Sequence, residues 1–247
     1  MIRALVVDLD GTLIDSSERI SDRVHRAVTR IAEKLYVAIA TGREPSDAIR
    51  FARQLGLETP QISDGGATII DPSTGQSLWR YPLDPADAES IVRHLNELQA
   101  AFIATHPGGS ATRFDDVPHW NLTRVSALDL EEHVSEGLVA EFDQQGDMQA
   151  VKVFLPYNNL WAVDFTRKGV DKAKATLRLA SMLGLEAAQL VGVGDSYNDL
   201  PLLRVCGLGI AMGDAPDELK AIADFVAPSA QEDGLAVAIE EFLLPML

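Results

Sequence analysis

Residues 6–13 read VVDLDGTL, an apolar run that ends in two carboxylates one residue apart and a Gly-Thr turn. The run predicts a buried strand over residues 4–7. Because side chains alternate along a strand, Asp8 and Asp10 are expected to point to the same side and Leu9 to the other. Two carboxylates in one small space repel each other unless a cation or a shared proton offsets the repulsion. The spacing is typical of a hard-metal site or an acid/base couple, with an Asp that caps an Asp-Gly turn as the structural alternative.

A second apolar run, VGVGDSYND at residues 191–199, ends in an acid and carries another acid four residues later. A helix that begins near Ser196 places Asp199 in its first turn, where a negative charge suits the positive end of the helix dipole. Asp195 then lies at the strand tip. Ligands of open parallel sheets bind outside the carboxyl ends of the strands. Asp195 is therefore expected to converge with the acid pair of the first strand, and three acids at one tip need a divalent cation.

A third apolar run, VAIATGR at residues 37–43, ends in a hydroxyl, a flexible glycine and a cation. The Thr41 hydroxyl and nearby backbone N–H groups are suited to phosphate oxygens, but Thr-Gly-Arg taken alone favours a structural turn. Lys172 opens an amphipathic helix that is predicted to run to about residue 183. A lysine on a helix is usually solvated. The Thr-Gly-Arg segment and Lys172 therefore indicate a site only in combination with the acidic residues.

In this order, the four pieces resemble the haloacid dehalogenase-like (HAD) superfamily of phosphohydrolases, in its Cof-type branch with an α/β (type IIB) cap. The branch's pattern of D-x-D-G-T, T-G-R, a lysine, G-D-S-x-N-D and A-M-G stands at residues 8–12, 41–43, 172, 194–199 and 211–213. The resemblance implies an α/β fold with a Rossmann-like three-layer core and a parallel sheet. It places the catalytic core at residues 1–82 and 167–247, and an inserted smaller α/β cap, which selects the substrate, at residues 83–166.

The resemblance also implies roles for single residues. Asp8 would be the nucleophile that forms an aspartyl-phosphate, and Asp10 the general acid/base. Mg²⁺ would be bound by the side chains of Asp8 and Asp195 and by the backbone carbonyl of Asp10. Asp199 would not bind the metal directly but would orient either its water ligands or Lys172. The phosphoryl group or the rest of the substrate would be bound by Thr41, Gly42, Arg43, Lys172 and Asn198.

The function that this resemblance implies is a Mg²⁺-dependent phosphomonoesterase for a small phosphorylated metabolite, a sugar phosphate or a phosphoglycolate-like compound. A phosphomutase or phosphotransferase would use the same aspartyl-phosphate intermediate. A third reading, from another class, is a non-catalytic sensor of a phosphometabolite, because fold alone does not fix function. A pure binder has no need of Asp10, which speaks against the sensor.

Composition limits the partners and the compartment. The chain of 247 residues has a net charge of −16, which opposes non-specific binding to nucleic acid or to an anionic membrane. Its single cysteine, Cys206, forms no disulfide framework, so we expect a cytoplasmic protein. Arg204 interrupts the apolar region 200–212, and no segment approaches the length of a membrane span. We therefore expect a small phosphorylated metabolite as partner, without nucleic acid or membrane; the oligomeric state stays open.

Apolar strands alternate with helical patterns up to residue 57, where Ser21 is predicted to cap the first helix and Pro45 to begin the second. A hairpin with strands at 67–70 and 77–81 follows. In the cap we expect helices at 86–100 and 130–142, strands at 102–105, 150–155 and 161–166, and loops between residues 105 and 130.

Two positions depart from the family's common pattern, because Asp64 and Asp214 stand where relatives often have Asn. These acids either face the cleft, where they would disfavour substrates with additional negative charge, or cap turns. Polar and aromatic side chains in the predicted cap are candidates for contact with the leaving group; they are His106, Arg113, His119, Trp120, Arg124 and Lys152.

Overall fold

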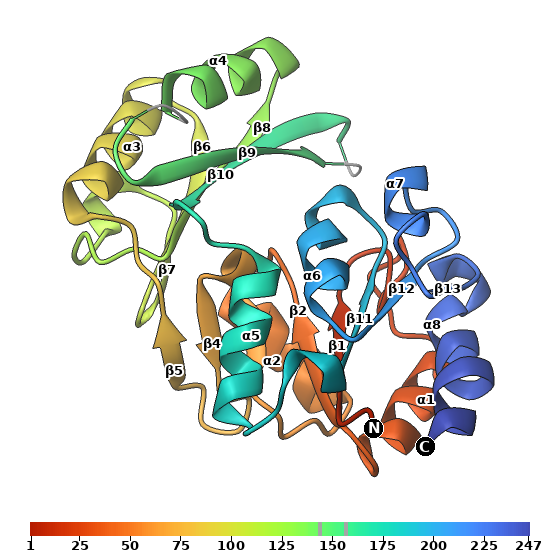
Figure 1. Cartoon of the computed structure of the whole chain (residues 1–247). Helices are drawn as coiled ribbons and strands as arrows, with labels where there is room; N and C mark the ends of the chain where they lie inside the picture. Colours follow the sequence, from red (N-terminus) through yellow and green to blue (C-terminus); the bar gives the residue numbers. More distant parts are fainter. Residues whose placement is uncertain (143–144, 156–157) are drawn as a thin grey trace. The chain divides into compact units, whose positions relative to one another are not determined.

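The computed structural model describes residues 1–142, 145–155 and 158–247. It divides into two compact units, the first made of Met1–Leu78 and Asp171–Leu247 and the second of Trp79–Val170 (Figure 1). The second unit is inserted in the chain of the first. Its ends lie a few residues outside the predicted cap limits of 83 and 166.

The first unit is built on an eight-stranded sheet in the order β13-β12-β11-β1-β2-β3-β4-β5. The neighbours β13 to β3 pair in parallel, and β4 adds to β3 in the antiparallel direction. The parallel sheet predicted from the apolar runs is therefore confirmed. The strands are β1 (Ala4–Asp8), β2 (Tyr36–Ala40), β3 (Gln61–Ser63), β4 (Thr68–Ile70), β5 (Ser77–Arg80), β11 (Leu190–Gly194), β12 (Leu208–Ala211) and β13 (Phe225–Val226).

The first two helices begin at the residues that the sequence marks as helix starts. The Ser21 hydroxyl accepts a hydrogen bond from the Val24 N–H at 3.1 Å, and Pro45 is the first residue of the second helix, both as predicted. The helices of the first unit are α1 (Asp22–Ala32), α2 (Pro45–Gln54), α5 (Lys172–Met182), α6 (Leu200–Val205), α7 (Asp217–Lys220) and α8 (Gly234–Val237).

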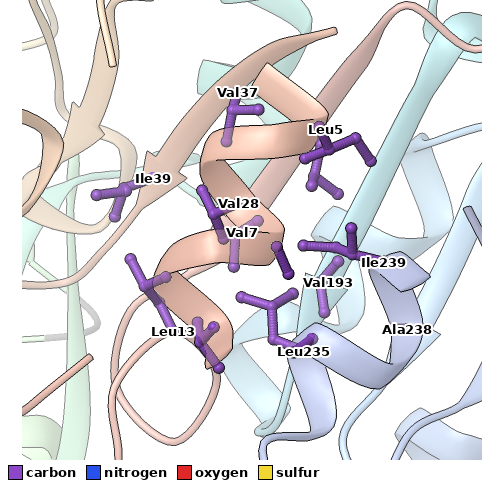
Figure 2. Close-up of a cluster of buried hydrophobic side chains, with 14 of the residues drawn as sticks. Leu5, Val7, Leu13, Val28, Val37, Ile39, Val193, Leu235, Ala238 and Ile239 are labelled. Atoms are coloured by element: carbon purple, nitrogen blue, oxygen red, sulfur yellow. The ribbon is translucent and has the colours of Figure 1, made fainter. Parts of the chain in front are cut away.

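Alternate residues of β1 enter different layers. Leu5 and Val7 are buried in the main apolar cluster together with Val28 of α1 and Leu235 of α8. Figure 2 shows these side chains gathered between the sheet and the helices. Each such aliphatic side chain contributes about 1.5–3 kcal/mol when it is fully removed from water. This packing fixes which face of β1 is turned toward α1.

The opposite face of β1 meets a different helix. Ala4 packs with Ala180 of α5 and with Leu190. By the same alternation, Asp8 points to the side of α5. The last residue of β1, Asp8, is therefore directed toward α5, the helix that begins at Lys172.

The second unit contains a five-stranded antiparallel sheet in the order β7-β6-β8-β10-β9. Residues of α3 and α4, Ile91 and Leu138 among them, form its apolar core with the sheet. The elements are α3 (Pro85–Glu97), β6 (Ala101–His106), β7 (Gly109–Ala111), β8 (Arg124–Leu130), α4 (Glu132–Phe142), β9 (Met148–Leu155) and β10 (Leu160–Arg167).

The central strand β8 corrects the sequence prediction, which placed loops between residues 105 and 130. Val125 and Ala127 of this strand are fully buried, at 0% exposure, whereas Ser126 between them lies on the other face. Side chains of the core face thus alternate along β8 with side chains of the other face, but small and polar residues make the hydrophobic pattern weak. Burial between two neighbouring strands, rather than local propensity, forms the strand.

No helix among the described residues combines the length and the apolarity that a membrane crossing requires.

Candidate active site

The predicted acidic residues come from two neighbouring strands. Asp8 is the last residue of β1, and Asp195 directly follows the last residue of β11. The two strands pair in parallel, so their carboxyl ends lie at one edge of the sheet. Carboxylate oxygens of Asp8, Asp195 and Asp199 lie within 4.8 Å of one another. The predicted convergence of Asp8 with Asp195 is therefore present and Asp199 joins them, but the carboxylate of Asp10, which was expected there too, is not part of this cluster.

Lys172 is the cation of this cluster. Its ammonium contacts a carboxylate oxygen of Asp8 and lies 2.6 Å from Oδ1 of Asp199. The Lys172 side chain is only 3% exposed. A buried ammonium is costly unless its charge is paired, and two carboxylates here supply that pairing. Lys172 is thus a member of the site, unlike a solvated lysine on a helix surface.

Asp199 forms hydrogen bonds with several members of the cluster. Its Oδ2 accepts hydrogen bonds from the N–H groups of Asp195 and Ser196, at 3.1 and 3.2 Å, while its other oxygen accepts from Lys172. Asn198 also turns its Oδ1 toward the Lys172 ammonium, at 3.4 Å. The predicted helix start near Ser196 is a 3₁₀ turn, Tyr197–Asp199, in which Ser196 is the N-cap.

Burial and mutual repulsion dominate the titration of the carboxylates. Burial, followed by the charge of Asp199, raises the pKa of Asp195 to about 6. Burial raises the pKa of Asp8 well above its ordinary value, and the charge of Asp199 adds to this effect. Burial alone would lower the pKa of Lys172, but the charges of Asp199 and Asp8 outweigh it and raise that pKa. The site therefore carries more negative charge than its lysine can compensate.

This donor set fits a hard divalent cation. Both oxygens of Asp199 are engaged by Lys172 and by backbone N–H groups, so the carboxylates of Asp8 and Asp195 are the ones that can face an ion. Carboxylate oxygens are the ligands that Mg²⁺ prefers, and a cation would relieve the repulsion that raises the two pKa values.

Gly11 explains why the turn after β1 needs a glycine. It adopts a left-handed backbone with φ of 74°, and a Cβ at this position would stand 2.2 Å from Oδ2 of Asp195. Any larger residue would therefore displace Asp195. Gly194 has the same function for Asp199, because its Cβ would stand 2.4 Å from the Cβ of that acid.

The Thr41-Gly42-Arg43 segment follows β2, the neighbour of β1 on the other side. Thr41 is fully buried, and its hydroxyl oxygen accepts a hydrogen bond from the N–H of Arg43 at 3.0 Å. Its carbonyl accepts from the N–H of Gly65, also at 3.0 Å.

The side chain of Arg43 has partners that the sequence did not predict. Its Nε lies 3.0 Å from Oδ2 of Asp10 and its Nη2 lies 2.5 Å from Oδ1 of the same carboxylate. The Nη2 group also lies 2.9 Å from Glu18. Burial would lower the pKa of Arg43, but the hydrogen bonds and charges of Asp10 and Glu18 raise it above its ordinary value. The structure thus pairs Arg43 with Asp10, a partner that was not predicted.

Asp64 and Asp214 have different surroundings. Asp64 is buried at the start of a 3₁₀ turn, and its Oδ2 accepts a hydrogen bond from the Thr68 hydroxyl at 2.8 Å. Asp214 is exposed, and its charge contributes to the raised pKa of Asp195, after burial and after the charge of Asp199. Asp64 therefore has a local structural partner, while Asp214 adds negative charge near the acidic cluster.

Among the candidates in the second unit, Arg124 is the most buried. It is 6% exposed and its Nη1 lies 3.7 Å from Asp164 on the neighbouring strand. Lys152 pairs with Glu132 and Glu136 of α4, at 3.0 and 3.2 Å. The Lys152 side chain therefore lies on the face of its sheet that α4 covers.

The remaining candidates lie around β6 and the segment after it. The rings of His106 and His119 meet edge to face at 5.7 Å, and burial lowers the pKa of His106. Trp120 packs on Phe114 at 5.7 Å, and Arg113 is an exposed residue.

The comparisons with known proteins agree with this geometry. A family model for haloacid dehalogenase-like hydrolases matches residues 5–116 and 111–239. The 5-amino-6-(5-phospho-D-ribitylamino)uracil phosphatase YitU of Bacillus subtilis is 26% identical over 268 aligned residues, covering 96% of each chain. The phosphoglycolate phosphatase of Natronomonas pharaonis is 30% identical over 241 residues, covering 97% of each.

The fold is also found among solved structures. A sugar phosphatase of HAD subclass IIB superposes with a TM-score of 0.78 at 20% identity, over 97% of this chain and 98% of the other. The matches to the family model and to the curated phosphatases extend over nearly the whole chain. The chain therefore belongs to the haloacid dehalogenase-like hydrolases, among the phosphatases of that superfamily.

Proposed function

We propose that the chain is a Mg²⁺-dependent phosphomonoesterase that hydrolyses a small phosphorylated metabolite through an aspartyl-phosphate on Asp8. The observation that supports this most directly is the buried cluster in which Lys172 bridges Asp8 and Asp199 beside Asp195. Three buried charged groups, Asp8, Lys172 and Asp199, beside the half-buried Asp195 are costly for the fold, and the proposed phosphoryl transfer gives each of them a role.

In the first step, a carboxylate oxygen of Asp8 attacks the phosphorus and the bond from phosphorus to the leaving oxygen breaks. Asp10 donates its proton to that oxygen, which departs as an alcohol. Lys172, with the Thr41 hydroxyl, Gly42 and Asn198, binds the equatorial oxygens, where negative charge must be stabilised in the transition state.

In the second step, a water attacks the phosphorus of the aspartyl-phosphate. Asp10, now ionised, takes a proton from that water, and the bond between phosphorus and the Asp8 oxygen breaks. Inorganic phosphate leaves and Asp8 returns to its ionised form, so the protons balance over the cycle.

Mg²⁺ would be held by the side chains of Asp8 and Asp195 and by the backbone carbonyl of Asp10, and it would neutralise charge on the phosphoryl oxygens. Asp199 keeps Asp195 and Lys172 in place through the hydrogen bonds described above. The second unit would act as the cap that selects the substrate. A sugar phosphate or a phosphoglycolate-like compound is the substrate class favoured by the relatives' names.

The test is phosphate release from a panel of sugar phosphates, phosphoglycolate and nucleotides, with and without Mg²⁺. The Asp8→Asn variant is the blank, because it removes the nucleophilic oxygen and keeps the shape. Metal-dependent release that vanishes in the blank is the expected result. Phosphate transfer to a second substrate without release would instead identify a phosphotransferase.

The role of Asp10 is tested separately. Asp10→Asn is expected to keep Mg²⁺ binding, because its contact with the metal is through the backbone carbonyl, and to lose at least a hundredfold in turnover. Titration calorimetry with Mg²⁺ measures the first effect. A collapse of binding would show that the Asp10 side chain is itself a ligand.

A further inference from the structure

Glu18 and Arg43 form a short chain of side chains that ends on the carboxylate of Asp10. We propose that Glu18 is a positioning residue for the proton transfers of Asp10 and acts through Arg43. The inference rests on the proposed function, because it assigns Glu18 a purpose only if Asp10 is the general acid/base.

The first link is the fork between Arg43 and Asp10. Two guanidinium nitrogens meet the two oxygens of one carboxylate, at 3.0 and 2.5 Å. Such a bidentate pair fixes the plane of the carboxylate as well as its distance. The Asp10 side chain is 53% exposed and lies past the end of β1, so packing alone does not fix its orientation.

The backbone of Arg43 is itself firmly placed. Its N–H donates to the Thr41 hydroxyl at 3.0 Å, and its carbonyl accepts from the N–H of Asp64 at 2.9 Å. Arg43 therefore projects from a fixed point. Its long side chain still has several rotatable bonds, and a second partner is needed to hold its guanidinium.

Glu18 is that second partner. Its Oε1 lies 2.9 Å from Nη2 of Arg43, the same nitrogen that contacts Asp10. The loop that carries Glu18 is shaped for this contact, since Glu18 adopts a left-handed backbone with φ of 56° and its N–H donates to the Asp15 carbonyl. This conformation is unfavourable for a residue other than glycine. Asp15 also accepts a hydrogen bond from the Ser17 N–H, at 2.8 Å, which closes the turn.

Asp47 is a weaker partner of the same arginine. It lies 3.8 Å from Nη1 of Arg43 and only 2.7 Å from Arg50, which is its nearer partner. Asp10 takes part in the proposed reaction, whereas Glu18 lies outside it and holds the guanidinium while Asp10 reacts.

The experiment compares two substrates that differ in their need for an acid. An alkyl phosphate that the wild type hydrolyses leaves as an alkoxide and needs the proton of Asp10, whereas p-nitrophenyl phosphate has a leaving group that departs without one. The quantity measured is kcat/KM, which reports the steps up to formation of the phosphoenzyme. For Glu18→Gln, we expect kcat/KM to fall about tenfold or more for the alkyl phosphate and less than about twofold for p-nitrophenyl phosphate.

Arg43→Lys is expected to show the same selectivity with a larger loss, because lysine cannot form the bidentate fork. The matched control is Glu240→Gln, which removes a similar arginine partner, 2.7 Å from Arg23, away from Asp10. It should leave both values unchanged.

Two results would overturn the inference. An equal loss for both substrates would mean that Glu18 supports the fold of the loop, and no loss for either would mean that its contact with Arg43 has no effect on Asp10. If the wild type releases phosphate from no compound in the panel, the proposed function fails and this inference fails with it. An active wild type with unselective variants overturns the inference alone.

Discussion

Oδ2 of Asp199 accepts a hydrogen bond from the backbone N–H of Asp195, at 3.1 Å. The other oxygen of Asp199 meets the Lys172 ammonium at 2.6 Å. One fully buried carboxylate thus satisfies a backbone donor of the residue that would bind a metal and a cation that would bind phosphate. The position of both groups depends on a side chain whose two oxygens both accept hydrogen bonds.

Asp199→Asn is expected to lower the free energy of unfolding by about 2–4 kcal/mol. The NH₂ group of the new amide replaces one acceptor oxygen, so it must face either the Lys172 ammonium or the backbone N–H of Asp195, both of which are donors. Urea unfolding measures the change. Asp224→Asn is the control, since Asp224 accepts from the Gly209 N–H at 2.8 Å and the amide oxygen of Asn can replace that acceptor. Similar losses in the two variants would contradict the donor argument.

Lys172→Met is expected to cost about 3–5 kcal/mol of stability, because it leaves the carboxylates of Asp8 and Asp199 buried without their cation. Lys174→Met, two residues later on the same helix, replaces an exposed lysine and should change stability by less than about 0.5 kcal/mol. Chemical unfolding in the absence of divalent ions measures both. A small effect at residue 172 would mean that the two acids become protonated at little cost.

Gly11→Ala is expected to abolish Mg²⁺ binding, because the new methyl group would stand 2.2 Å from an oxygen of Asp195. Gly56→Ala separates this clash from backbone strain, since Gly56 has φ of 67° and nothing lies within 4 Å of its Cβ position. The control should lose about 1–2 kcal/mol of stability and keep the metal. Calorimetric titration compares the two variants, and retained binding in Gly11→Ala would show that Asp195 can move without loss.

Cys206 is expected to resist alkylation in the folded protein. Burial raises the pKa of its thiol from 9.0 to about 12, and the thiolate is the reactive form. Between these pH values the unfolded chain ionises the thiol and the folded chain does not, so the free energy of unfolding falls as the pH rises through this window. Iodoacetamide labelling at pH 9 should be at least tenfold slower in the native protein than in urea. Equal rates would mean that the thiol is accessible.

The strands of the first unit could be predicted because apolar runs such as residues 4–7 and 37–40 are buried on both faces of the sheet. The meeting of Asp8 with Asp195 also followed from the sequence, since the ends of neighbouring parallel strands share one edge. The strand β8 could not be predicted in this way, because polar residues interrupt its buried residues Val125, Ala127 and Leu130, and its neighbours in the sheet supply the rest.

The contact between Arg43 and Glu18 also lay beyond the sequence analysis. It depends on a left-handed residue in the loop before α1, and neither the residue types nor their spacing indicates that conformation. The expectation that Arg43 binds the substrate came from the family resemblance, which does not indicate that two carboxylates lie within reach of its guanidinium.

The division of β1 between two layers also limits how this strand can change during evolution. Leu5 and Val7 belong to the layer of α1, and Asp8 points the other way. A single-residue insertion or deletion within the strand would exchange the two faces, sending a charged group into the apolar layer and a leucine or valine toward Lys172. The strand can therefore accept substitutions that keep its volume, or length changes in pairs. Drift by one residue would displace Asp8, the proposed nucleophile, and disrupt the core packing at once.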